Sequence, residues 1–222
     1  MMPAEPVPQE PFSIDAALED SLKEVDGEGI LLQTALERLG PASFCFVSLL
    51  LSVLFIQPFS LGPLTMASAL TFMAAGWQMV RRAQYPKLPK RMKDARLHGK
   101  GWKMVLLFCQ KTLRFCRKFT RPRLQNWVSG DKGEQFIGWL ILIGGFLLAL
   151  PAANLPLNNT LPAFMILFAA IAWLEKDGMM IFISLAWGVL TLIYFLIVGL
   201  VLWFFGEQVA AWLHTFWGHF WK

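Results

Sequence analysis

Two long apolar runs, each interrupted near its middle, dominate the pattern of hydrophobic and polar positions along the chain. The runs cover residues 41–80 and 136–174, and neither contains a charged side chain. Their arms are short: residues 42–57, 64–80 and 136–150 number 16, 17 and 15. Such an arm is about 25 Å long as a helix, less than the ~30 Å hydrocarbon core of a bilayer. Each run therefore predicts either two tilted spans or a re-entrant hairpin that turns back inside the membrane, and we favour the re-entrant hairpin.

Paired helix breakers interrupt both runs at matching positions. The first break contains Pro58, Gly62 and Pro63, and the second contains Pro151 and Pro156. The prolines of each pair lie five residues apart, and corresponding prolines lie 93 residues apart. This spacing predicts two copies of one unit, made of a surface helix, a broken hairpin and a charged exit. The alternative is that two hairpin turns acquired their prolines separately.

A third apolar segment, residues 179–205, has 27 residues without a charge and predicts an ordinary transmembrane helix. Residues 209–221 carry Trp212, Trp217 and Trp221 and predict an interfacial C-terminal helix, because tryptophan concentrates at the membrane surface. Two hairpins that return to one side, followed by one full crossing, would place the C-terminus in the periplasm. A bent pair in place of that crossing would return it to the cytoplasm.

Amphipathic segments precede both broken runs and predict helices that lie on the membrane surface or on other helices. Residues 13–25 place their apolar side chains on one stripe, and residues 30–39 form a second short helix that ends at a Gly-Pro step. Residues 101–121 form a basic amphipathic helix before the second run. Residues 1–12 are rich in proline and acid, lack the features of a signal peptide, and predict a disordered tail.

Charge is divided unevenly along the chain. Residues 81–123 contain 15 of the 20 Lys and Arg residues and one acid, Asp94, whereas residues 1–40 contain nine acids and two bases. Basic segments between membrane helices lie on the cytoplasmic side, next to anionic head groups. The chain therefore predicts a multi-pass bacterial inner-membrane protein with residues 81–123 in the cytoplasm. The acidic and basic segments either pair or are separately solvated. We expect no nucleic-acid partner, because a basic helix between membrane segments is typical of a lipid-surface element.

The predicted fold class is an all-α polytopic membrane protein with two repeated hairpins, surface amphipathic helices and one long C-terminal transmembrane helix. We expect a disordered tail, a first repeat, a basic linker, a second repeat, and a final unit of one transmembrane and one interfacial helix. Their bounds are residues 1–12, 13–80, 81–100, 101–178 and 179–222.

Residue types that carry catalysis or metal binding are few and unsuitably spaced. Cys45, Cys109 and Cys116 form no Cys-x-x-Cys pair, and the three histidines have no partners at metal-ligand spacing. The sequence contains no Ser/His/Asp set, His-Glu-x-x-His motif or phosphate-binding glycine loop. We therefore expect no metal site, no cofactor and no enzymatic activity.

Several short motifs follow one another in the order of a known membrane-protein family. They are Leu36-Glu-Arg-Leu39-Gly40, then Gln78 with Arg81-Arg82 and Pro86-x-x-Pro89, a break with Pro151, Asn154 and Pro156, and the exit Trp173-Leu-Glu175-Lys-Asp177-Gly178. Over roughly residues 29–205 the chain resembles the ExoD family of exopolysaccharide-synthesis membrane proteins. The resemblance implies a role in exopolysaccharide production and assigns no chemistry to individual residues. The long acidic N-terminus and the Trp-rich tail depart from the family pattern.

The combined features predict a protein that binds or translocates an anionic lipid, or a lipid-linked carrier, in exopolysaccharide synthesis or export. Polysaccharide export uses a polyprenyl phosphate that must return across the membrane, and arginine binds phosphate through two parallel hydrogen bonds. The candidate binding residues lie at the exits of the runs and in the second break: Gln78, Arg81, Arg82, Asn154, Asn158, Glu175 and Asp177. The two breaks, with Pro58, Gly62, Pro63, Pro151 and Pro156, form the predicted path.

Structural roles compete with these assignments. Arg81 and Arg82 would then be anchors at the cytoplasmic surface, and Glu175 and Asp177 would end a helix. The alternative function is a non-transporting membrane scaffold that recruits polysaccharide-synthesis proteins or forms a homo-oligomer. Membrane lipids with anionic head groups are partners in both cases.

Overall fold

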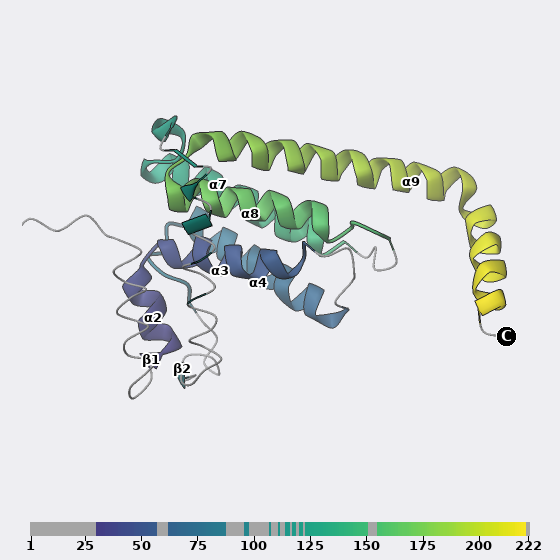
Figure 1. Ribbon diagram of the computed structural model, residues 1–222, viewed down its shortest axis with the longest axis horizontal. Coiled ribbons are helices and arrows are strands. Elements are labelled where there is room, and N and C mark those ends of the chain that lie inside the picture. Colours follow the sequence, from purple (N-terminus) through teal and green to yellow (C-terminus); the bar gives the residue numbers. More distant parts are fainter. Residues whose placement is uncertain are drawn as a thin grey trace, which may run out of the picture.

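The computed structural model describes residues 30–56, 62–87, 96–97, 107, 111, 114–115, 117–118, 120–121, 123–150 and 155–220. Within these residues the chain is almost entirely helical, which confirms the predicted all-α class (Figure 1). The helices are α2 (Leu32–Leu39), α3 (Ala42–Leu54), α4 (Pro63–Val80), α7 (Gly130–Leu148), α8 (Thr160–Glu175) and α9 (Gly178–Phe220), with a 3-10 turn, η1, over Gln125–Trp127. Strand β1 (Ile30–Leu31) pairs antiparallel with β2 (Arg96–Leu97).

Several predictions fall outside the described residues. These are the tail and helix at residues 1–25, Pro58, Pro151, Asn154 and most of the basic helix at residues 101–121. The predicted internal repeat and the re-entrant hairpins stay predictions.

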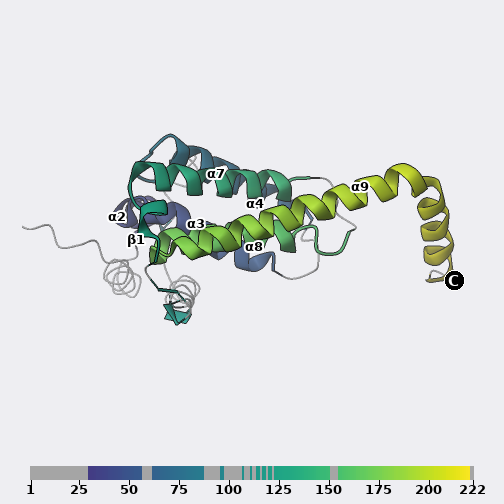
Figure 2. The same cartoon turned by 90° about the horizontal axis from the view of Figure 1, so that it is seen from above.

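Two helical hairpins form the body of the protein. Helices α3 and α4 make the first hairpin, and α7 and α8 make the second. Helix α4 packs mainly against α7 and α3 against α8, while α9 lies along α8 (Figures 1 and 2). Each helix therefore contacts the other hairpin or α9, and the two hairpins close a shared core.

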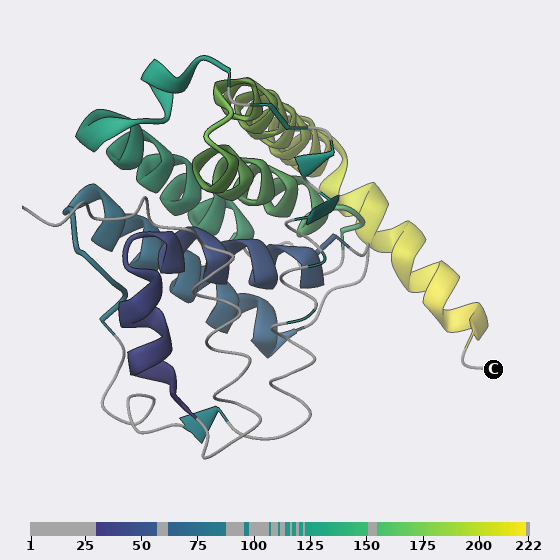
Figure 3. The same cartoon turned by 60° about the vertical axis from the view of Figure 1, so that its left-hand side comes forward.

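The ends of the bundle differ in character. At one end lie the beginnings of α3, α7 and α9 and the last turns of α4 and α8 (Figure 1). We call it the charged end because the ionisable side chains described below gather there. We call the opposite end, where α3 and α7 finish and α4 and α8 begin, the break end. Helix α2 leaves the charged end at a steep angle to α3 (Figure 3).

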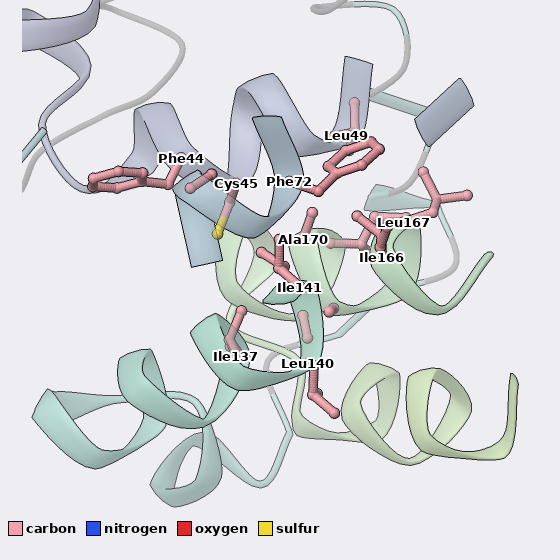
Figure 4. Close-up of a cluster of buried hydrophobic side chains, with 14 of the residues drawn as sticks. Phe44, Cys45, Leu49, Phe72, Ile137, Leu140, Ile141, Ile166, Leu167 and Ala170 are labelled. Carbon is pink, nitrogen blue, oxygen red and sulfur yellow. The ribbon is translucent and has the colours of Figure 1, made fainter. Parts of the chain in front are cut away.

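The core is built from side chains of all four hairpin helices. Leu49 of α3, Phe72 of α4, Ile141 of α7 and Ile166 of α8 are fully buried and lie near its centre, while Phe44, also fully buried, lies at its edge (Figure 4). Each such side chain removed from water stabilises a water-soluble fold by roughly 1.5–3 kcal/mol, but in lipid the gain comes from close packing instead. In lipid, the shape of the helix contacts would therefore matter more than the amount of apolar surface.

Two glycines bring the backbones of α4 and α7 into contact. A Cβ atom added to Gly76 would lie 2.6 Å from the carbonyl oxygen of Gly138, and one added to Gly138 would lie 2.9 Å from the carbonyl oxygen of Gly76. Gly145, two turns further along α7, similarly meets Phe72 and the backbone of Ala69. Small residues at such positions allow helices to approach closely without a hydrophobic driving force.

Large apolar side chains are exposed along the outer faces of three helices. They project from α4, α7 and α9, and include Leu64, Leu70, Trp77, Trp139, Ile143, Phe146, Val189, Leu192, Leu196, Trp203 and Phe204. Within the described part of the chain, α9 holds the single segment long and apolar enough to cross a membrane, Gly178–Val201. Figure 2 shows α9 continuing well past the ends of α7 and α8.

Two helix boundaries differ from the sequence-based expectation. Helix α7 begins at Gly130, before the apolar run, because Asp131 in its first turn interacts favourably with the positive end of the helix dipole. Residues 178–220 form one continuous helix, although two helices separated near Gly206 were expected. A single glycine costs a helix only about 1 kcal/mol, so the helix bends instead of stopping, as its yellow end shows in Figure 1.

The glycine contact gives a test of the fold. We expect Gly76→Ala to destabilise the protein by about 1–3 kcal/mol, because the added methyl group pushes α4 away from α7. Gly199→Ala is the matched control, since a Cβ atom there meets nothing within 4 Å. Thermal unfolding of the purified protein in detergent measures both. Equal melting temperatures for Gly76→Ala and the wild type would show that the contact is not tight.

Candidate functional site

Both hairpins end in the same backbone motif at the charged end. Arg82 after α4 and Lys176 after α8 adopt the left-handed conformation, with φ of 57° and 53°. The next amide closes the turn in each case: Ala83 N–H donates to the Gln78 carbonyl at 3.0 Å, and Asp177 N–H donates to the Ala172 carbonyl at 3.1 Å. This is the Schellman motif, in which glycine usually occupies the left-handed position. A basic side chain stands there in both hairpins.

The two cations in the left-handed conformation, Arg82 and Lys176, interact with acids near the beginning of α7. Arg82 Nη1 lies 2.7 Å from Asp131 Oδ2, although both side chains are largely exposed. Lys176 interacts electrostatically with Glu134, one turn further along α7. Acids at a helix N-terminus and bases after helix C-termini are each stabilised by the helix dipoles. Arg82, Asp131, Glu134 and Lys176 therefore form a cluster, the collar, that joins the ends of α4, α7 and α8.

Burial affects Glu134 and Lys176 more than their attraction does. Burial raises the pKa of the Glu134 carboxyl, while Lys176 pulls this pKa down and Asp131 pushes it up. Burial likewise lowers the pKa of the Lys176 ammonium, and Cys45 and Glu134 oppose that change. Both side chains lie outside the apolar run of residues 136–174. The inner half of the collar is thus partly shielded from water, whereas the Arg82–Asp131 half is open to it.

Each hairpin also ends with a cation stacked on a tryptophan. The Arg81 guanidinium carbon lies 4.6 Å from the centre of the Trp77 ring, and Lys176 Nζ lies 3.9 Å from the centre of the Trp173 ring. Stacking of this kind holds a cation in place by about 0.5–1 kcal/mol at an exposed site. Trp77 is exposed and Trp173 is half-buried, so the two pairs differ in their access to ligands.

Residues at the end of α8 and just after it contact two arginines of the basic segment, residues 81–123. Arg117 Nε lies 3.2 Å from both carboxylate oxygens of Glu175. Asp177 is buried, accepts the N–H of Arg121 at 3.1 Å, and caps α9 by accepting the N–H of Met179 at 3.0 Å. The Gly178 N–H donates to the carbonyl of Arg123 at 2.8 Å. The carboxylates of Glu175 and Asp177 therefore hold Arg117 and Arg121 against the junction of α8 and α9.

Neutral polar groups meet at the break end. Asn159 Nδ2 donates a long hydrogen bond of 3.5 Å to Thr65 Oγ1, which links the two hairpins. The Tyr194 hydroxyl of α9 donates to the carbonyl of Pro156. Asn158 is buried beside them, and Gly62 starts α4 with φ of +57° and Pro63 in its first turn. The described part of the second break, residues 155–159, thus has partners on α4 and α9.

The predicted site residues separate into two groups. Gln78, Arg81, Arg82, Glu175 and Asp177 lie at the charged end, where Gln78 Oε1 accepts the N–H of Lys87 at 2.7 Å. Gly62, Pro63, Pro156 and Asn158 lie at the break end, about the length of α8 away.

Sequence reasoning missed Asp131, Glu134 and Lys176 of the collar and the stacking partners Trp77 and Trp173. A tryptophan followed three or four residues later by a base, at the end of both runs, is the signal that could have found the stacked pairs. Across the described residues, His, Cys, Asp and Glu side chains form no group of three that could hold a metal ion.

Comparison with known proteins identifies the family. The sequence profile described as "Exopolysaccharide synthesis, ExoD" matches residues 14–214. Protein ExoD of Rhizobium meliloti (strain 1021) is 27% identical over 188 residues, which make up 84% of this chain and 78% of that protein. No solved structure gives a significant match. The chain belongs to the ExoD family of exopolysaccharide synthesis, and the resemblance predicted from its motifs is confirmed.

The shielded half of the collar predicts a pH-dependent stability. Because the folded pKa of Glu134 is raised, its contribution to stability is fully present below the unfolded pKa of about 4.3 and is lost as pH rises through the folded pKa. Glu134→Gln stays neutral at every pH. The melting temperature of this variant, minus that of the wild type, is therefore expected to increase between mildly acidic and neutral pH in detergent. A difference that stays constant or decreases would contradict the shielding of Glu134.

Proposed function

We propose that this ExoD-family protein is embedded in the bacterial inner membrane, with its charged end in the cytoplasm, and supports exopolysaccharide synthesis by binding an anionic lipid or lipid-linked carrier. The observation that carries the proposal is the separation of the apolar outer surface from the charged end. Large apolar side chains face outward on α4, α7 and α9, while the Arg82–Asp131 and Arg117–Glu175 ion pairs lie together at one end. Soluble monomers rarely expose apolar patches of this extent.

The length of α9 supports the embedding. The candidate span within α9, Gly178–Val201, has 24 residues and is about 36 Å long at 1.5 Å per residue, which exceeds the ~30 Å hydrocarbon core of a bilayer. The final part of α9 then runs at a steep angle to the bundle, as α2 does at the other end (Figure 1). Segments at both ends are thus oriented to lie along the two membrane surfaces.

The rise along α9 also gives the depth of the breaks in the membrane. Tyr194 contacts the second break, and it lies about 24 Å along α9 from Gly178. This is less than the ~30 Å thickness of the hydrocarbon core. If α9 crosses the bilayer from the charged end, the breaks lie within the far half of the membrane. This depth supports re-entrant hairpins, with the C-terminal end of α9 on the periplasmic side.

The charged end suits anionic lipids. Exposed basic side chains that are not paired with Asp131 surround it, including Arg81, Lys111, Arg114, Lys118, Arg121, Arg123 and Lys132. Cytoplasmic basic residues near a bilayer are attracted to anionic head groups by about 1 kcal/mol each. A polyprenyl phosphate carrier presents the same chemistry, a phosphate at the membrane surface, and links this binding to exopolysaccharide synthesis.

The packing of the interior favours binding at the surface over passage through the bundle. The backbones of α4 and α7 touch at Gly76 and Gly138, and most of the candidate charged residues already have protein partners. This packing also favours the second candidate function, a scaffold that organises synthesis proteins without moving lipid.

Cysteine accessibility tests the embedding. In a chain with Cys109 and Cys116 replaced by Ser, we expect Leu64→Cys and Leu157→Cys to resist a membrane-impermeant maleimide from either side, because lipid covers the break end. Both leucines are exposed on the protein itself. Lys132→Cys, at the charged end, should react from the cytoplasmic side. Rapid labelling of both break-end cysteines from the periplasm would make the breaks ordinary external loops.

Lipid retention tests the function. The full chain, reconstituted with equal amounts of phosphatidylcholine, phosphatidylglycerol and a polyprenyl phosphate, should keep the anionic lipids preferentially when native mass spectrometry releases it from the bilayer. Preference for the polyprenyl phosphate over phosphatidylglycerol would indicate a carrier, and equal retention would indicate general anionic lipid. If the anionic lipids are retained no more than phosphatidylcholine, lipid binding is excluded and the scaffold function is favoured.

A further inference from the structure

We infer that Arg81, stacked on Trp77, binds the phosphate group of an anionic lipid where the outer face of α4 reaches the membrane surface. This inference rests on the proposed embedding, and it names one site within the charged end. The ligand class is a lipid phosphate monoester or diester. Inorganic phosphate offers the same group without the acyl or prenyl chain.

The position of Arg81 follows from the helical repeat of α4. Leu70, Ala74, Trp77 and Arg81 are spaced by four, three and four residues, so they lie along one face of the helix. All four are exposed, whereas Phe72, Gly76 and Met79 pack inward. The apolar stripe that would face lipid therefore continues into an exposed tryptophan and then into a guanidinium. Tryptophan prefers the interface, so the next turn lies at the height of the phosphates.

The stacking prepares Arg81 for a phosphate. The Arg81 guanidinium carbon lies over the Trp77 ring, 4.6 Å from the ring centre, and the guanidinium carries five N–H donors in one plane. A guanidinium held in this way can form two parallel hydrogen bonds to phosphate oxygens with less loss of side-chain entropy. Within the described part of the chain, Arg81 pairs with no acidic side chain.

The neighbouring cations are arranged differently. Arg82 adopts the left-handed conformation and is paired with Asp131, and Lys176 is half-buried in the collar. Adjacent arginines therefore have separate roles, since Arg82 joins the helix ends and Arg81 faces outward. This difference supplies a control, because the double variant Arg82→Gln/Asp131→Asn removes an ion pair without changing the net charge.

The test repeats the lipid-retention measurement on variants of the full chain. We expect Arg81→Gln to retain polyprenyl phosphate or phosphatidylglycerol about tenfold less than the wild type, since a charge-assisted contact is lost. Arg81→Lys keeps the charge but loses the paired hydrogen bonds, so its lipid retention should lie between that of Arg81→Gln and that of the wild type. Arg82→Gln/Asp131→Asn should bind like the wild type. Melting temperatures in detergent identify any variant that fails to fold, and Arg81→Lys then carries the test.

The outcomes separate this site from the proposed function. Anionic lipid retained by the wild type and equally by Arg81→Gln and Arg81→Lys would overturn the assignment of Arg81 while leaving lipid binding in place. No anionic preference in any protein would overturn both. Competition by inorganic phosphate at concentrations similar to the lipid would indicate a site for free phosphate and overturn the lipid assignment. Loss of binding in the Arg82→Gln/Asp131→Asn control alone would move the site to the collar.

Discussion

The direct contact between the backbones of α4 and α7 fixes how the two hairpins sit together. Gly76 and Gly138 allow the two helices to touch without intervening side chains, and any larger residue at these positions would separate them. The contact uses the face of α4 that also carries Phe72, which points into the core. The opposite face, with Trp77 and Arg81, must then face outward. The orientation of the candidate lipid site is therefore a consequence of helix packing far from that site.

The same contact creates the collar. Because α4 ends where α7 begins, Arg82 after α4 meets Asp131 in the first turn of α7, and opposite charges coincide with opposite ends of the helix dipoles. A residue other than glycine in the left-handed conformation costs about 1 kcal/mol. Arg82 and Lys176 both carry this cost at equivalent cap positions. Their side chains connect the two hairpin ends through Asp131 and Glu134, which glycine could not do.

Local patterns predicted the elements well and their contacts poorly. The all-α class, the hairpin arms and the long C-terminal helix follow from apolar runs and prolines, because these features act within a few residues. The collar joins Arg82 to Asp131, 49 positions later, and no periodicity reports which helices become neighbours. The adjacent Arg81 and Arg82 look alike in the sequence. They differ in the structure because the left-handed turn at Arg82 directs one side chain to α7 and leaves the other on the outer face of α4.

The break end shows why α9 is more than an anchor in the proposed embedding. A chain that turns inside hydrocarbon leaves carbonyl groups without helical partners, and each needs a donor. The Tyr194 hydroxyl supplies one to the carbonyl of Pro156, and Asn159 reaches Thr65 of the other hairpin. A hairpin that stopped short of the far surface without these contacts would have to draw water into the bilayer. The position of Tyr194 on α9 is thus coupled to the depth at which the second hairpin turns, and α9 and the hairpins stabilise each other as one unit.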